Sequence, residues 1–290
     1  MIVKQLLDNT SPVKPILNPT PQKPKFVPSP IQKPFVRSLP ESQGVSSTQV
    51  SAFLNALKDD PTLDMHGVLI LKNGKMIAEA AFGAYDQKVW HITHSECKSI
   101  TGLAVGMLID EGKLSLDDRV IDIFASRVSK INQLTHRNMT IKHLLTMTSG
   151  VTFNEAGSVT EMDWVKCFLE SAVLKEPGTS FQYNSMNTYM LACAIKQITG
   201  QGLVDYLKPR LFEPLGISNF FWETCPMGNE KGGWGLYILP EDIAKIGQLV
   251  LDGGKFEGKQ LVSEQWIAEA TRAQAQPPKT LGNYNYGYQT

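Results

Sequence analysis

The sequence carries no excess charge of either sign, and it has no long hydrophobic run. Its 290 residues include 28 basic and 28 acidic side chains, so the formal net charge is zero. Nucleic-acid binders and proteins held on membranes by polybasic surfaces need an attractive field, so this balance argues against nucleic-acid and membrane partners. The longest apolar stretch, residues 100–109, is too short to span a bilayer.

Cysteine is also scarce. Four cysteines are too few for a disulfide framework in a chain of this length, and none forms a C-x-x-C pair. Cys97 and Cys193 lie in apolar helical patterns, which is typical of reduced core thiols. The first residues lack the apolar core of a signal peptide. We therefore expect a cytoplasmic protein.

Proline is concentrated at one end of the chain. Nine of the 17 prolines lie within the first 40 residues, where they block helices and sheet ladders and favour extended backbone. We predict a Pro-rich arm over residues 1–45, either flexible or laid on the surface of the body. Residues 46–290 have ordinary globular composition and are predicted to form the folded domain.

The apolar pattern after residue 45 alternates between helix and strand. Asn73-Gly74 separates two apolar runs within residues 67–83, which predicts a β-hairpin. A helical stripe follows over 95–111. Residues 113–230 show almost no strand signal, so they are predicted to form a helical subdomain. Further helices are predicted over 46–57, 140–147, 161–171, 186–198, 202–212, 240–251 and 263–273.

The sharpest chemical feature is Ser95-Glu96-Cys97-Lys98 at the start of the helix predicted over 95–111. Residues three apart on a helix lie on one face, so the Lys98 amine can reach the Ser95 hydroxyl. A serine hydroxyl becomes a good nucleophile when a neighbouring base takes its proton, and a lysine can do so where burial disfavours its charged form. The helix N-terminus adds N–H groups where an acyl oxyanion would develop.

A second polar motif stands just before another predicted helix. Tyr183 lies in Phe-Gln-Tyr-Asn-Ser, residues 181–185, after the Pro177-Gly178 turn. A tyrosine in a cleft can relay a proton between nucleophile, lysine and leaving group. The alternative is a capping segment with a half-buried tyrosine, which the motif alone would favour.

Several segments in order resemble the serine β-lactamase-related family, which includes class C β-lactamases, D-alanyl-D-alanine carboxypeptidases, esterases and 6-aminohexanoate-oligomer amidases. The resemblance extends from about Ser46 to the last residue, through residues 95–120, 141–151, 181–200, 211–217 and 232–254. The S-x-x-K element is one that penicillin-recognising enzymes share. The resemblance implies an α/β (α+β) fold, with an antiparallel sheet flanked by helices and a helical domain, and with the site between them.

The same resemblance assigns roles to individual residues. It implies that Ser95 is acylated, that Lys98 is its base and that Tyr183 is a second proton carrier. The serine at position 185 resembles the esterase and amidase branch, because class C β-lactamases have asparagine at this position of the motif (Tyr-x-Asn). We assign Ser185 and Trp234 to substrate binding. The chain stops at GNYNYGYQT, before the third motif of the family, so we expect that its last strands are missing and that the domain is incomplete at its C-terminus, as a fragment or a natural truncation.

Competing motifs carry less weight. His91 and His94 have no third ligand at suitable spacing, so we predict no metal site, and the hydrolase mechanism needs no cofactor. The Gly-Gly-Trp-Gly run over 232–235 is no nucleotide-binding motif, and we interpret it as a tight loop. The first hypothesis is therefore a serine hydrolase that cleaves a small-molecule ester or amide. The alternatives are a D-Ala peptidase or β-lactamase, and a non-catalytic binding member. The oligomeric state stays open.

Overall fold

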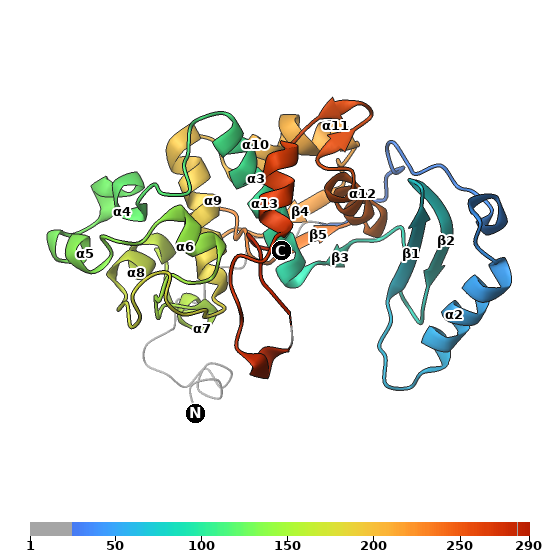
Figure 1. Cartoon of the computed structure of the whole chain (residues 1–290), viewed down its shortest axis with the longest axis horizontal. Helices are drawn as coiled ribbons and strands as arrows, with labels where there is room; N and C mark the ends of the chain where they lie inside the picture. The colour runs from blue at the N-terminus through green and yellow to red at the C-terminus, as the bar shows by residue number, and fades with distance from the viewer. Residues whose placement is uncertain (1–24, 283) are drawn as a thin grey trace.

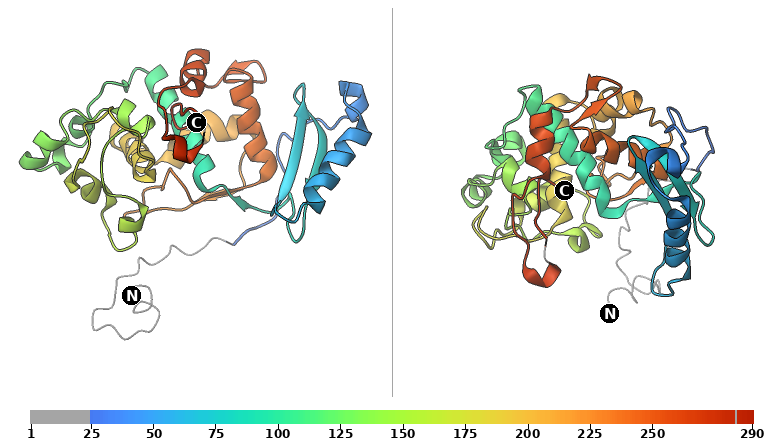
Figure 2. Two further views of the ribbon diagram at one scale, coloured as in Figure 1. Left: turned by 60° about the horizontal axis from the view of Figure 1, so that its bottom comes forward. Right: turned by 45° about the vertical axis from the view of Figure 1, so that its right-hand side comes forward.

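The computed structural model describes residues 25–282 and 284–290, and a β-hairpin forms one end of the molecule (Figure 1). Strands β1 (Gly67–Lys72) and β2 (Lys75–Ala81) pair antiparallel, as predicted. Asn73 (φ 51°) and Gly74 (φ 70°) both take the left-handed conformation that this turn requires. Helix α2 (Ser47–Asp59) lies along the hairpin (Figure 2), and it is capped by Ser46, whose side chain accepts from the N–H of Gln49.

A second, three-stranded sheet occupies the middle of the molecule. Its order is β3 (His91–Ile92), β5 (Leu236–Ile238) and β4 (Phe220–Trp222), with antiparallel pairing throughout. Strand β4 lies in the region where the sequence showed almost no strand signal, because a run of three residues is too short to display alternation. A small hairpin, β6 (Lys255–Phe256) and β7 (Lys259–Gln260), stands apart from both sheets.

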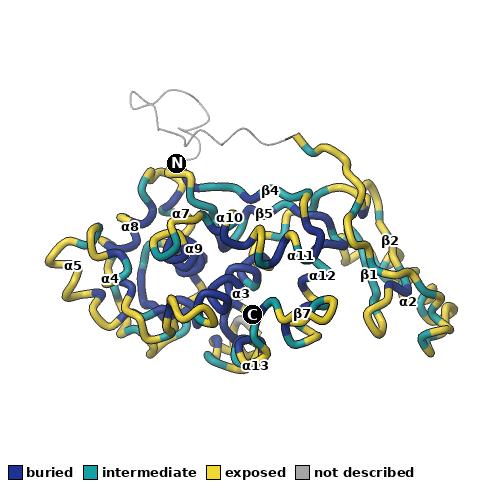
Figure 3. The backbone as a smooth tube through the Cα atoms, turned by 90° about the horizontal axis from the view of Figure 1, so that it is seen from above, coloured by how far each residue is buried: buried dark blue, intermediate teal, exposed yellow. Residues whose placement is uncertain are grey.

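Two helices form the centre of the core, α3 (Cys97–Asp110) and α9 (Ser185–Thr199), and they pack against each other (Figure 3). Helix α3 is buried on nearly all sides rather than along one stripe. Its two glycines make this possible, since a Cβ at Gly102 would lie 2.9 Å from the carbonyl oxygen of Tyr288, and one at Gly106 would lie 2.2 Å from the ring of Trp266. The last residues of the chain and α13 (Glu264–Thr271) thus cover this helix.

The remaining helices agree with most of the predicted ranges. The helix predicted over 202–212 divides into α10 (Leu203–Leu207) and a π-helical turn (Lys208–Phe212), where Pro209 has no N–H to donate. Within the described ranges, none of the helices has the length and apolarity needed to cross a membrane. The others are α4 (Val120–Ile123), α5 (Lys130–Thr135), α6 (Ile141–Leu145), α7 (Glu155–Ser158), α8 (Trp164–Glu170), α11 (Glu213–Leu215) and α12 (Pro240–Leu251).

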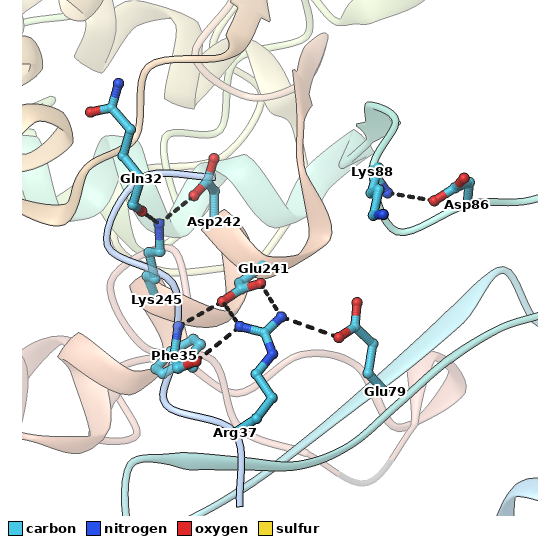
Figure 4. A network of polar contacts seen from close by, with 9 residues as sticks. All are labelled: Gln32, Phe35, Arg37, Glu79, Asp86, Lys88, Glu241, Asp242 and Lys245. Carbon is cyan, nitrogen blue, oxygen red and sulfur yellow. Dashed lines mark hydrogen bonds and ion pairs between the residues drawn. The ribbon is translucent and has the colours of Figure 1, made fainter. Parts of the chain in front are cut away.

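The part of the Pro-rich arm that the structure describes is docked on the body, while residues 1–24 lie outside the described residues. Arg37 joins helix α12 to the hairpin (Figure 4), because its guanidinium donates to both carboxylate oxygens of Glu241, at 2.8 and 2.7 Å, and to Glu79 at 3.2 Å. The backbone of Ser38 donates to the carbonyl of Met76 at 2.9 Å. This segment therefore ties the hairpin to the central body.

One turn further along α12, a buried ion pair also anchors the described part of the Pro-rich arm. Lys245 is 1 % exposed, and its Nζ donates to Asp242 Oδ1 at 2.7 Å and to the carbonyl oxygen of Gln32 at 2.6 Å. Burial raises the pKa of Asp242, against the opposing effect of the lysine. An acid in the first turn of a helix interacts favourably with the helix dipole, and here it also has a buried partner in Lys245.

Candidate active site

The turn between β3 and α3 presents Ser95 to solvent. Residues His94–Glu96 form a single 3₁₀ turn, and His94 takes the left-handed conformation (φ 45°), which is uncommon for a residue with a side chain. The His94 carbonyl accepts from Cys97 Sγ at 3.1 Å, so the first buried residue of α3 fastens the turn. The backbone is thus bent so that Ser95 stands at the open end of a buried helix.

Lys98 lies against Ser95 from the inside of the molecule. Its Nζ is 3.1 Å from Ser95 Oγ, the side-chain contact that the three-residue spacing predicted. Lys98 is 2 % exposed, whereas Ser95 is exposed. A second contact of Nζ, with the carbonyl oxygen of Gly233 at 2.6 Å, fixes the amine from the other side. A buried amine and an accessible hydroxyl therefore face each other across a hydrogen bond.

The glycine loop after residue 231 is the part of the site that sequence reasoning missed. Three donors of α3 face it: Lys98 meets the Gly233 carbonyl, while Thr101 Oγ1 (2.8 Å) and Cys97 Sγ (3.6 Å) meet the Gly232 carbonyl. A Cβ at Gly233 would lie 3.1 Å from the Ser185 carbonyl oxygen and 3.4 Å from Lys98 Nζ. The only sequence signal for this contact was the run of glycines, which gave no indication of the helix it would meet.

Tyr183 reaches the same amine from the chain that leads into α9. Lys98 Nζ lies 5.0 Å from the centroid of the Tyr183 ring, so the face of the ring meets the amine. The ring is 44 % exposed and borders the open side of the site. Asn184 fixes this segment, since its Nδ2 donates to the carbonyl oxygens of Val151 and Phe153, at 3.2 and 2.8 Å.

Of the two residues that we assigned to substrate binding, Ser185 lies deeper than expected, whereas Trp234 is half-buried. Ser185 is fully buried beside Gly233, and its Oγ has no hydrogen-bond partner among the described residues. The Trp234 ring stacks on Trp164 of α8, with centroids 5.8 Å apart and an interplanar angle of 14°. It connects the glycine loop to the helical part of the molecule.

The two ionisable groups that follow Ser95 in the sequence, Glu96 and Cys97, both have raised pKa values. Burial raises the pKa of Cys97 to about 11, so its thiol stays protonated near neutral pH and cannot compete as a nucleophile. Burial of its carboxylate also raises the pKa of Glu96, although the residue as a whole is exposed. Across the residues that the structure describes, no group of three or more His, Cys, Asp or Glu side chains is placed to hold a metal ion.

Comparisons with known proteins place this chain in one family. The Beta-lactamase family model matches residues 56–290, and the chain belongs to that family. It is similar to the penicillin-binding protein from Bacillus halodurans, with a TM-score of 0.64 and 18 % identity over 81 % of both chains. It is also similar to EstCE1, a hydrolase with promiscuous acyltransferase activity, with a TM-score of 0.69, 18 % identity, and coverage of 86 % of this chain and 82 % of that one. The chain therefore has the β-lactamase/transpeptidase-like fold that the sequence predicted.

A curated relative is similar in sequence over a shorter part. The 6-aminohexanoate-dimer hydrolase of Paenarthrobacter ureafaciens is 26 % identical over 220 residues, which is 69 % of this chain and 55 % of that protein. The chain thus spans about half the length of this relative.

Proposed function

We propose that the protein is a serine hydrolase that cleaves small esters or amides through an acyl-enzyme on Ser95. The observation that carries this proposal is the contact of 3.1 Å between the buried Lys98 Nζ and the exposed Ser95 Oγ. Membership of the Beta-lactamase family and the relatives named as hydrolases support it. Four free thiols, three of them buried, support a reducing, cytoplasmic location as the second part of the proposal.

In the proposed mechanism, Lys98 is the general base that accepts the Ser95 hydroxyl proton as Oγ attacks the substrate carbonyl carbon. The remaining N–H groups of Nζ hold the Gly233 carbonyl and keep the lone pair directed at Ser95. The Ser95 backbone N–H stabilises the oxyanion that forms. The proton then passes through Tyr183 to the leaving group as the carbonyl–heteroatom bond breaks. The same steps then run in reverse, with water in place of the leaving group. Water attacks the acyl carbon, the bond to Ser95 Oγ breaks, and the acid is released with Ser95 restored.

This mechanism requires one movement of a side chain. Because the ring face of Tyr183 meets Lys98 Nζ, its hydroxyl must turn toward the amine or the leaving group before it can transfer a proton. The ring is half exposed, so such a rotation displaces solvent rather than packed core.

The proposal is tested by labelling the intact chain with a fluorophosphonate probe and mapping the modified peptide. We expect a single adduct on Ser95, because the phosphonyl group reports a serine whose proton is taken by a neighbouring base. Prior denaturation serves as the control and should abolish labelling. An adduct on another serine, or a native chain that remains unlabelled, would exclude Ser95 as the activated nucleophile and leave the non-catalytic alternative.

A further inference from the structure

A cavity of about 200 Å³ lies between the hairpin, the β3–β5 pair and α12, beside the residue that follows Ser95. We propose that it binds the ammonium group and chain of a short aliphatic amine. Its walls come from β1, β3, β5 and the first turn of α12, elements that Figure 1 shows on the hairpin side of the site. Glu96 connects it to the nucleophile turn.

Most of the cavity wall is aliphatic. Leu69 of the hairpin, Ile92 and Ile238 of the paired strands, and Ile243 of α12 all line it. Its volume equals that of roughly six water molecules at about 30 Å³ each, enough for a short alkyl chain. Water gains few hydrogen bonds along such walls, so an alkyl group that displaces it is favoured.

Two acceptors stand in the polar part of the lining, beside Thr93 and two histidine rings. Among the side chains that the structure describes, Glu96 is the only Asp, Glu, Lys or Arg that lines the cavity. Gln87 also lines it and is 7 % exposed, and its Oε1 has no hydrogen-bond partner among the described residues. Its Nε2 donates to the carbonyl of Ala80, which fixes the orientation of the amide. A carboxylate and an unmatched carbonyl together require a ligand that donates hydrogen bonds.

The charge of the lining selects a cation over an anion. In the part of the chain that the structure describes, no lysine or arginine lines the cavity, so an anion would meet Glu96 without a compensating partner. His66 and His91 border it as aromatic rings, and His66 stacks on Tyr85 with centroids 3.5 Å apart. A protonated primary amine meets all of these conditions, because it joins three N–H donors and a positive charge to an alkyl chain.

As a subsite of the enzyme, the cavity would take an amino-alkyl part of the ester or amide that Ser95 attacks, and this reading rests on the proposed function. As a binding site, it does not depend on the reaction. Binding and catalysis can therefore be measured separately, with probes that no hydrolase can cleave.

The experiment compares pentylamine with pentan-1-ol, which has the same chain length without the charge. Binding to the full chain is measured at pH 8 by ligand-observed NMR, for the wild type, for Glu96→Gln and for the matched control Glu264→Gln, an exposed acid at the start of α13. We expect the wild type and E264Q to bind the amine about fivefold more tightly than the alcohol, and E96Q to lose this preference. A second variant, Glu96→Lys, should exclude the amine while it still admits the alcohol.

Equal affinity of the wild type for the two probes would overturn the proposal, and so would a preference that survives in both Glu96 variants. These outcomes are distinct from failure of the hydrolase. An unlabelled Ser95 together with selective amine binding would overturn the proposed hydrolase activity and support the amine site. Labelling of Ser95 without any amine preference would support the hydrolase activity and overturn the amine site.

Discussion

Replacement of Lys98 by methionine should lower kcat/KM for p-nitrophenyl butyrate by about 1,000-fold, the scale of a lost general base. Methionine keeps an unbranched chain in the buried position but cannot accept the Ser95 proton or hold the Gly233 carbonyl. Initial rates of nitrophenol release give the comparison. The matched control is Lys113→Met, which removes an exposed lysine that pairs with Glu111 at 2.7 Å, and which should leave the rate within twofold of the wild type.

The thermal stability of the Lys98 variant separates chemistry from folding. The variant leaves the Gly233 carbonyl without its donor but places no new charge in the core, so it should stay folded and melt close to the wild-type temperature. Wild-type turnover by a folded Lys98→Met protein would show that another group activates Ser95.

The second large effect concerns stability rather than activity. Lys245→Met should lower the free energy of unfolding by about 3 kcal/mol at neutral pH, because it leaves the Asp242 carboxylate buried without its cation. Denaturant titration with a common m-value gives the difference. The exposed Lys259→Met is the control and should change the free energy by less than about 0.5 kcal/mol.

Two further measurements identify the cause of that loss. The double variant Lys245→Met with Asp242→Asn should recover most of the stability, since no buried charge remains. The single variant should also approach the wild type as the pH falls. Burial raises the folded-state pKa of Asp242 above its unfolded value, so the unpaired acid becomes neutral, and its penalty declines, as the pH drops through that raised pKa. An undiminished loss in the double variant would show that packing, and not charge, holds the segment.

Local patterns predicted the features that depend on neighbours in the sequence. The hairpin turn follows from two residues that accept positive φ, Asn73 and Gly74. The contact between Ser95 and Lys98 follows from helical spacing. Helix α12 begins at Pro240 and ends at Leu251, as predicted, because proline starts helices well and the apolar stripe marks its length.

Contacts between distant segments could not be found in the same way. Gly232 and Gly233 meet α3 across more than 130 residues, and a glycine carries no side chain whose pattern would indicate a partner. Arg37 resembled any basic residue of a Pro-rich arm, yet it joins α12 to the hairpin. Ser185 was expected at the substrate because of its place in a motif, whereas the packing of α9 buries it. In each case, the outcome depends on tertiary packing that sequence spacing does not encode.

The burial of α3 shows the same limit within a single element. Its apolar stripe predicted a helix with one hidden face, but Gly102 and Gly106 allow the chain end and Trp266 to approach the opposite face. A pattern of side chains records which positions are apolar. It does not record where the absence of a side chain admits a second neighbour.

Intact-mass spectrometry is the most direct test of whether Ser95 carries the acyl group. The chain is incubated with p-nitrophenyl butyrate, quenched in acid and weighed beside Ser95→Ala and the neighbouring control Ser99→Ala, whose native hydroxyl contacts the Gln289 carbonyl instead of the lysine. We predict a mass gain of one butyryl group in the wild type and in Ser99→Ala, and none in Ser95→Ala. An equal gain in Ser95→Ala, or no gain in any of the three proteins, would contradict an acyl-enzyme on Ser95.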